Sequence, residues 1–537
     1  MATINDLPDE VLEFIINLLP PYKDVESCRL VCKRWADLGK NARFRKTINF
    51  QRSVAEGNLC WKEWEPPDAV APRIAGRFSH CAAVFKSIMY IFGGGSSKVT
   101  TFNDLWAFNL STRTWIRCNS HGNHPYPSPK ARATMVCHEG QLVVFGGLRY
   151  PPIYPPFQRV CLFDELHVYN LEEEHWFYPK ISTPWPPAMA GHSATIHGRQ
   201  MVIFGGLQET ALNVTYSNDI WCLDLETYAW KLQKTSPTKP EPRIDHYQIR
   251  LDDEHLLIVG GVGGVNNPFT DMWLLTMISS VWSWKEIPVR NKKCGATRMW
   301  TNPSCHVDEK LIVLGQNSTL PKDLQITNQI RLNIQAQRTF PQHQEQHRLR
   351  NPFQDPPNLT APPPPLYGGG RRQPARGDAA APEPSRVRQN FPRASSDHHH
   401  LGMMAFRESH SGLDMRERRL AALQKREQEL QARRGMPLVV PTPKPTPCPP
   451  KKTRQNCEAL FICDLSHVLH PHEPFVEWQE VQDGGVLPGA PVKTILSSLV
   501  AGNGELIVFG GLEQNTNQGN YTANNYLHFI TVPHTVI

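Results

Sequence analysis

Four arginines recur along the chain, each just ahead of a short apolar stretch. They are Arg77, Arg132, Arg243 and Arg298. A guanidinium group donates paired hydrogen bonds to a carboxylate or a phosphate, so a ring of such groups would bind an acidic or phosphorylated peptide segment. One interpretation of the recurrence is therefore a binding site for such a segment, built from these four arginines.

The same recurrence also fits a structural role, because an arginine repeated in successive units of a fold can pair with a carboxylate of a neighbouring unit. Asp104 and Asp219 are partners that the sequence offers for this alternative. The third unit departs from the pattern, since it carries Ala190-Gly191-His192 in place of the arginine. Both interpretations stay open, and a ring of arginines would be incomplete.

Histidines recur in the same way, one to a unit. They are His80, His192, His246 and His306. A metal site needs three or four converging ligands, whereas residues spread one to a unit are expected to hydrogen-bond the strand backbones. Neither a metal nor another cofactor is predicted. The glycine-rich run at 260–264 lacks the Lys-Ser/Thr of a phosphate-binding loop, so no catalytic residue is predicted.

The elements that position these residues form a repeat of apolar strands that end in a glycine pair. Such pairs lie at 93–94, 146–147, 205–206, 260–261 and 510–511, with a degenerate copy that ends at Gly315. Each of the first four units continues with an acidic residue and then a tryptophan: Trp115, Trp176, Trp230 and Trp282 or Trp284. Four short strands in a unit of about 50 residues are typical of propeller blades. The tryptophans are expected to fill the wedges between blades.

The repeat resembles the Kelch repeat, which implies an all-β six-bladed propeller with the arginines at its substrate-binding mouth. The last unit lacks a tryptophan strand, and a spare one, Trp61–Trp64, precedes the first complete unit. We therefore expect the N-terminal strand to complete the C-terminal blade, because closure removes exposed strand edges. The propeller would comprise residues 58–315, with the closing strand and blades one to five in part, and 456–537.

A long insertion separates the two halves of blade five. Residues 316–455 hold 20 of the 48 prolines and a net charge of +12, which leaves a net charge of −5 for the rest of the chain. This composition predicts a disordered segment. It would join a second strand at 311–315 to a third at 459–465, with a fourth at 476–478. A short helix is expected at 411–434, either transient and solvated or partner-binding.

The apolar residues within 1–48 are spaced as in α-helices. Apolar residues of the first stretch fall on one helical face: Leu7, Val11, Leu12, Ile15, Leu18 and Leu19. Pro20-Pro21 is expected to end that helix. So small an all-α unit cannot cover its own apolar surface. It must pack on the next domain or be completed by a partner.

Two motifs in this region, Leu7-Pro8-Asp9-Glu10-Val11-Leu12 and Val31-Cys32-Lys33-Arg34-Trp35, resemble the F-box. The resemblance implies binding to a Skp-family adaptor and, through it, to the cullin of an SCF ubiquitin ligase. The implied contact residues are Leu7, Pro8, Val11, Leu12, Ile15, Leu30, Val31 and Trp35. An ordinary helical hairpin packed on the propeller is the alternative.

The two resemblances together indicate an F-box and Kelch-repeat protein. They imply a non-catalytic subunit that presents a protein target for ubiquitination and degradation. A propeller scaffold or metalloenzyme without a ligase role is the alternative. No membrane span or secretory signal is expected, and 13 scattered cysteines indicate reduced thiols in the cytoplasm or nucleus. Nucleic-acid binding by the basic insertion is not expected, because that segment has few aromatic residues.

Overall fold

The computed structural model describes twelve stretches of the chain. They are residues 3–66, 71–98, 100–119, 125–150, 160–180, 184–210, 214–264, 267–297, 299–300, 302–315, 457–514 and 521–533. All of them belong to one unit, Met1–Gln342 with Lys452–Ile537. The predicted insertion, its helix at 411–434 and Arg298 lie outside the described residues. Within the described stretches, every cysteine is a free thiol, and no helix has the length and apolarity to span a membrane.

The N-terminal region is helical, as its apolar spacing predicts. Its elements are η1 (Ile4–Asp6), α1 (Asp9–Leu18), α2 (Lys23–Arg29) and α3 (Lys33–Glu56). Helix α1 ends ahead of Pro20-Pro21, since proline cannot continue a helix. Helix α3 ends at Gly57, whose φ of 68° suits a glycine that follows a helix. The predicted domain boundary at residue 48 therefore falls inside α3.

The other described residues form six sheets of four or more strands, named blade one to blade six in chain order. Blade one holds β2 (Cys81–Phe85), β3 (Ile88–Phe92), β4 (Leu105–Asn109) and β5 (Thr114–Cys118), and blade two holds β6 (Thr134–His138), β7 (Gln141–Phe145), β10 (Leu166–Asn170) and β11 (His175–Phe177). Blade three holds β13 (Ser193–His197), β14 (Gln200–Phe204), β17 (Ile220–Asp224) and β18 (Trp230–Gln233), and blade four holds β19 (Tyr247–Arg250), β20 (His255–Val259), β23 (Met272–Thr276) and β24 (Ser283–Glu286).

Blade five combines strands from both sides of the insertion. It holds β26 (Ser304–Val307), β27 (Lys310–Gly315), β28 (Ala459–Asp464) and β29 (Val476–Trp478), with β25 (Val289–Arg290) parallel to β29 at its edge. Strands β27 and β28 are antiparallel, and Gly315 lies opposite Ala459. This pairing confirms the predicted position of the insertion between the second and third strands of one blade.

Blade six is closed by the N-terminal strand, as predicted. It holds β31 (Ser498–Ala501), β32 (Glu505–Phe509), β35 (Leu527–Thr531) and β1 (Cys60–Glu63). Strand β1 pairs with β35, with Cys60 opposite Thr531. The first strands of neighbouring blades contact one another in a closed cycle from β2 through β6, β13, β19, β26 and β31 back to β2. The blade number of the whole chain remains the prediction made from the repeats.

Short ribbons extend the blades beyond the glycine pairs. They are β8 (Leu148–Arg149) with β9 (Cys161–Leu162), β12 (Met189–Ala190) with β15 (Leu207–Glu209) and β16 (Val214–Tyr216), β21 (Val262–Gly263) with β22 (Asn267–Pro268), and β30 (Thr494–Ile495) with β33 (Leu512–Gln514) and β34 (Tyr521–Ala523). Single turns η2 (Lys292–Cys294) and η5 (Gln482–Gly485) complete the described elements. The ribbons share an apolar cluster with members from all six blades, including Phe78, Ile244 and Trp300.

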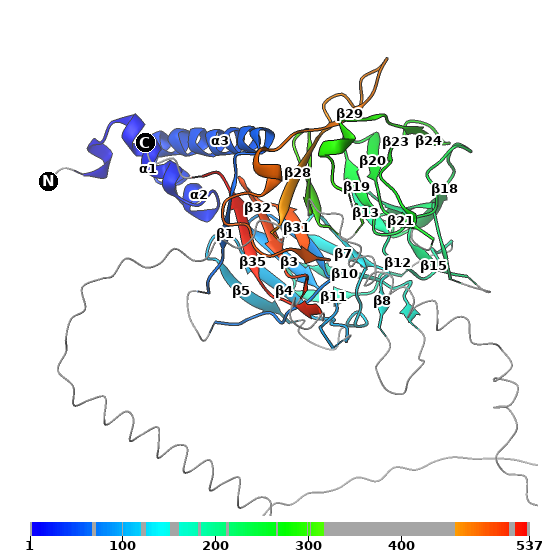
Figure 1. Ribbon diagram of the computed structural model, residues 1–537. Helices are drawn as coiled ribbons and strands as arrows, with labels where there is room; N and C mark the ends of the chain where they lie inside the picture. Colours follow the sequence, from blue (N-terminus) through cyan, green and yellow to red (C-terminus); the bar gives the residue numbers. More distant parts are fainter. Residues whose placement is uncertain are drawn as a thin grey trace, which may run out of the picture. The chain divides into compact units, whose positions relative to one another are not determined.

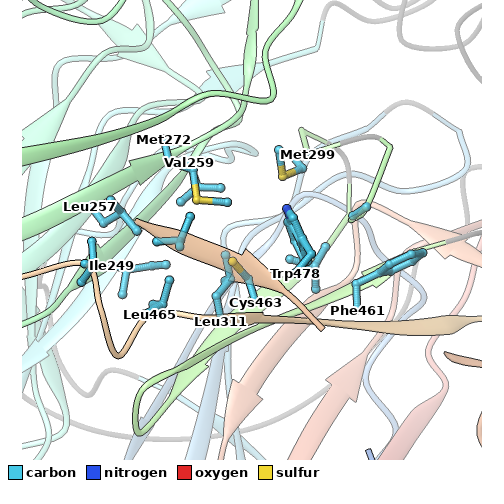
Figure 2. Packing of buried hydrophobic residues seen from close by; sticks show 14 of the residues in the cluster. Ile249, Leu257, Val259, Met272, Met299, Leu311, Phe461, Cys463, Leu465 and Trp478 are labelled. Atoms are coloured by element: carbon cyan, nitrogen blue, oxygen red, sulfur yellow. The ribbon is translucent and has the colours of Figure 1, made fainter. Parts of the chain in front are cut away.

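Tryptophans fill the wedges between blades, as predicted. Trp176 of blade two packs on Phe92 of blade one, Trp230 on Phe145, and the ring centroids lie 5.4 and 4.7 Å apart. Trp115 closes the cycle against Phe509 of blade six. Figure 2 shows the wedge between blades four and five, where Trp478 of β29 lies among apolar side chains of both blades.

The glycine pairs allow one blade to approach the next. A Cβ on Gly93 would lie 2.5 Å from the carbonyl oxygen of Lys130 in blade two, and its φ of 65° is also unfavourable for other residues. The same clash recurs between Gly510 and the carbonyl of Arg77 at 2.7 Å. Contact between adjacent blades thus requires glycine at these positions.

Helix α3 reaches from the helical region to the blades. Near its start, Leu38 and Ala42 pack with residues of α1 and α2. Near its end, Phe50 and Val54 join an apolar cluster with residues of blades five and six, including Leu460 and Ile462 of β28. Figure 1 shows this end of α3 beside β28. The helical unit thus packs on the propeller and still leaves apolar surface uncovered.

Candidate functional site

An apolar face on α1 is open to solvent. Val11, Phe14 and Leu18 follow the spacing of one helical face and are 42%, 53% and 63% exposed. Pro8 is exposed, and Leu7 and Ile15 are half-buried at the margins. Large apolar groups rarely gather in this way on a surface unless they contact a partner.

Leu12 has a different place from its neighbours. It is fully buried and packs with Ile16 and Val25 in the core of the three helices. An adaptor would not reach it in this conformation, so Leu12 supports the docking face without belonging to it. Trp35 is also half-buried against this core, and its indole N–H donates to the side-chain oxygen of Asn5 at 3.0 Å.

The turn between α2 and α3 adds two exposed residues, Leu30 at 87% and Val31 at 59%. Arg34 ties the start of α3 to the start of α1, because its guanidinium donates to Asp9 and to the carbonyl of Leu7 at 2.7 and 2.6 Å. The turn and the face on α1 are thereby held together. We call the surface of Leu7, Pro8, Val11, Phe14, Ile15, Leu18, Leu30 and Val31 the docking face.

The implied contact residues left out Phe14 and Leu18. Leu18 already belonged to the predicted apolar face, and Phe14 could have been found because it continues the spacing of Val11. Phe44 and Ile48 on α3 were also missed, and they are 67% and 36% exposed.

A buried polar cluster joins the helices to the blades. The Tyr22 hydroxyl donates to Glu505 at 2.6 Å, and Arg113 donates to the other oxygen of Glu505 at 2.9 Å. The Lys23 amide donates to the side chain of Ser111. Ser111 and Arg113 lie in the turn between β4 and β5, and Glu505 begins β32. These turns are at the opposite end of the strands from the glycine pairs, so the helices pack on the end away from the predicted mouth.

Two of the predicted substrate-binding arginines are buried. Arg77 is 0% exposed and donates to both oxygens of Asp104 at 2.8 and 3.1 Å, while Arg243 does the same to Asp271 at 2.7 and 2.8 Å. Burial alone would raise the pKa of Asp104, but the hydrogen bonds and charge of Arg77 lower it below its ordinary value. Each guanidinium also lies over a phenylalanine ring. This geometry favours the structural alternative, with the partner in the same blade as the arginine.

Lys130, and not Arg132, is the repeat equivalent of Arg77 and Arg243. The carbonyls of these three residues accept from glycine amides of the preceding blade in the same way. Lys130 is 1% exposed, pairs with Glu165 at 2.7 Å and lies over Phe163. The sequence comparison was therefore displaced by two residues in blade two. We call each buried cation with its carboxylate and aromatic ring a cation clamp.

Arg132 belongs to a ring of backbone hydrogen bonds between blades. Its amide donates to the carbonyl of Ser79, and its carbonyl accepts from Gly191, both at 2.9 Å. Asp245 continues the ring by donating to Gly191. The Arg132 side chain spans from blade two to blade four and donates to Asp245 at 2.6 and 2.9 Å. Like the other described arginines of the predicted set, it already has a carboxylate partner.

The recurring histidines join neighbouring blades. His80 contacts the Ser498 hydroxyl at 2.9 Å, His192 contacts Thr134 at 2.9 Å, and His246 contacts Ser193 at 2.6 Å. The predicted hydrogen-bonding role is right, but the partners are side-chain hydroxyls and not strand backbone. Burial lowers the pKa of His80 and His192 to about 3, so both rings are neutral near pH 7. Over the described part of the chain, no three His, Cys, Asp or Glu side chains are grouped to hold a metal ion.

Comparison with known proteins gives two family matches. The model described as "FBX42, beta-propeller domain" matches residues 77–284, and the model described as "F-box-like" matches residues 4–51. The second match includes the docking face, and the first includes the three cation clamps.

Curated relatives match about half of the chain. Kelch domain-containing protein 1 of Mus musculus is 24% identical over 274 residues, which are 48% of this chain and 64% of the relative. Acyl-CoA-binding domain-containing protein 4 of Arabidopsis thaliana is 27% identical over 289 residues, 52% of this chain and 41% of the relative. The chain spans less than two thirds of the length of these relatives. The chain therefore contains an F-box-like region and a propeller region related to that of FBX42, and it is similar to Kelch domain-containing proteins.

Proposed function

We propose that the chain is the substrate-recognition subunit of an SCF-type ubiquitin ligase. Its docking face binds a Skp-family adaptor and thereby the cullin, and its propeller binds the protein to be ubiquitinated and degraded. The chain itself catalyses nothing in this proposal. It holds the target near the ubiquitin-charged enzyme, which raises the effective concentration of the reacting groups. The proposal puts the chain in the cytoplasm, the nucleus or both, where thiols stay reduced.

The observation that carries the proposal is the docking face. Eight of the sixteen large apolar side chains that are exposed among the described residues lie between Ile4 and Ile48. A domain that already packs on the propeller through Phe50 and Val54 has no internal use for them. An adaptor that covers them removes this apolar area from water, and such burial drives most protein association.

The attachment of the helices supports the proposal that the adaptor and the target bind at opposite ends of the blades. Tyr22, Arg113 and Glu505 fix the helices to one end of the blades, which leaves the end with the glycine pairs available to a target. The paired and buried arginines remove the physical reason to expect an acidic or phosphorylated target segment. The target end is therefore proposed without the arginine ring.

Substitutions on the docking face test the proposal. The triple variant Val11→Ala, Leu30→Ala, Val31→Ala is expected to lose affinity for a purified Skp-family adaptor by about 100-fold or more, because central interface residues each contribute more than about 1 kcal/mol. The melting temperature should not change, since all three side chains are exposed.

A control variant tests whether the loss of affinity is specific to the docking face. Ile116 and Leu232 are exposed on β5 and β18, at 58% and 49%. The double variant Ile116→Ala, Leu232→Ala should bind the adaptor as well as the unmodified chain. Adaptor binding that survives the triple variant, or that the control weakens equally, would favour a propeller scaffold without a ligase role.

A further inference from the structure

Blade five has neither the cation nor the carboxylate of a cation clamp. In blades one, two and four, Asp104, Glu165 and Asp271 directly precede the residue that pairs with the last residue before the glycine pair, and they bind the buried Arg77, Lys130 and Arg243. In blade five that pairing joins Leu314 and Leu460, so Ala459 takes the place of the carboxylate and Glu458 lies one residue earlier. The equivalent of the cations is Met299, because its carbonyl accepts from the Gly261 amide as theirs accept from glycines of preceding blades, and Met299 shares an apolar cluster with Ala459.

Glu458 is therefore a buried carboxylate that belongs to no cation clamp. It is 2% exposed, and one of its oxygens accepts from the backbone and hydroxyl of Thr494 at 2.9 and 3.3 Å. Its Oε2 has no hydrogen-bond partner. Burial raises its pKa to about 7, against the lowering effects of Thr494 and of the Lys493 charge. A buried acceptor without a donor costs free energy unless a ligand supplies one.

Glu458 lines a cavity of about 290 Å³ between blades five and six. Glu63 of β1 and Glu513 of β33 also line it, so three carboxylates surround the space. The lining contains no lysine or arginine, and burial lowers the pKa of His528, which keeps that ring neutral near pH 7. Lys493 is the cation that acts on Glu458 from nearby, and it leaves an excess of negative charge.

A second unpaired group lines the same cavity. Asn524 is 8% exposed, and its Nδ2, a hydrogen-bond donor, has no acceptor. A ligand that donates to Glu458 and accepts from Asn524 satisfies both groups. A metal cation can pair with the carboxylate, but it neither donates nor accepts a hydrogen bond. An arginine or lysine residue of a peptide does both, because its side chain donates and its backbone carbonyl accepts.

The cavity lies toward the target end of the blades. Glu458 and Asn524 precede the third strands β28 and β35, and Gly510 of a glycine pair is part of the lining. The helices contact turns at the other end. A bound target would reach the cavity without meeting the adaptor.

We propose that this cavity binds an arginine or lysine side chain of the protein target. The cationic group lies between Glu63 and Glu513 and donates to the unpaired oxygen of Glu458. This inference rests on the proposed function, since it names the kind of target segment that the propeller recognises.

Binding of two matched peptides to the full chain tests the inference. The probes are fluorescently labelled Gly-Gly-Arg-Gly-Gly and the same peptide with citrulline, which has nearly the same shape and no charge. The arginine peptide is expected to bind at least about ten times more tightly than the citrulline peptide. Because the cation requires ionised Glu458, affinity should rise about tenfold from pH 6 to pH 8.

Three variants locate the site. Glu458→Gln should remove the preference for arginine, and so should the double variant Glu63→Gln, Glu513→Gln, which leaves the buried position intact. Glu172→Gln removes the same charge at an exposed turn between β10 and β11 and should keep the preference.

Equal binding of the two peptides, no binding of either in the millimolar range, or a preference that survives both lining variants overturns the inference. Adaptor binding is measured on the same preparations. A chain that binds the adaptor but shows no preference for arginine contradicts this inference alone, whereas loss of adaptor binding would contradict the proposed function.

Discussion

The helical end and the blades differ in what they leave uncovered. In the blades, tryptophans, histidines and buried cations each contact a group in the same blade or the next one. In the helices, Leu30 and Phe14 stay exposed although a core is present beside them. Because the blades repeat, each blade packs against another copy that covers its apolar and polar side chains. The helical unit occurs once and has no second copy to pack against. Uncovered apolar groups therefore point to a partner at the helical end.

Removal of the closing strand should have the largest effect on the blades. Deletion through Pro66 removes β1, exposes the edge of β35 and loses Trp61, which is 6% exposed. We expect loss of cooperative unfolding, since loss of one buried tryptophan alone costs about 3–5 kcal/mol. Deletion through Glu56 keeps β1 and should leave a folded but less stable propeller, because Phe50 and Val54 are lost. Calorimetry distinguishes the two, and equal unfolding curves would contradict closure by β1.

Loss of a cation clamp should have the next largest effect. Arg77→Ala leaves Asp104 without its partner and is expected to lower the free energy of unfolding by about 3–5 kcal/mol. Arg77→Lys should lose less, since Lys130 occupies the same position in blade two. The control Arg199→Ala breaks a surface pair and should cost at most about 1 kcal/mol. A small loss in Arg77→Ala with weaker target capture would restore the substrate-binding interpretation.

Glu458 should behave in the opposite way, because it is buried and one of its oxygens has no hydrogen-bond partner. Its pKa is about 7 in the folded chain and near 4.5 when exposed, so the folded state loses stability as pH rises through this window. Glu458→Gln should therefore stabilise the chain by about 1–3 kcal/mol at pH 8, and the gain should shrink toward pH 5. Denaturant unfolding at the two pH values measures the gain. A variant less stable than the unmodified chain at pH 8 would show that the carboxylate has a partner.

Much of the propeller could be predicted, because its determinants repeat. The glycine pairs and tryptophans mark each blade, and the spare strand near Trp61 follows from a missing strand at the other end of the repeats. The sequence did not show that α3 continues to Glu56, since its last turns owe their burial to blades five and six and not to a new motif.

The site residues were harder to predict. Arg132 and Lys130 are two positions apart, and only the hydrogen bonds of their backbones show which of them is equivalent to Arg77. Leu12 carries the same motif signal as Val11, but one is in the core and the other is exposed. Glu458 could not be found from the sequence, because its burial and its unpaired oxygen depend on how blades five and six pack against each other.

Hydrogen exchange of the chain with and without a purified Skp-family adaptor tests the division between two ends most directly. The account predicts that the adaptor protects backbone amides of α1 and of the turn at Leu30 and Val31. Exchange near the glycine pairs and around Glu458 should not change. Protection at the glycine-pair end, or an absence of protection on α1 at adaptor concentrations that saturate binding, would contradict the account.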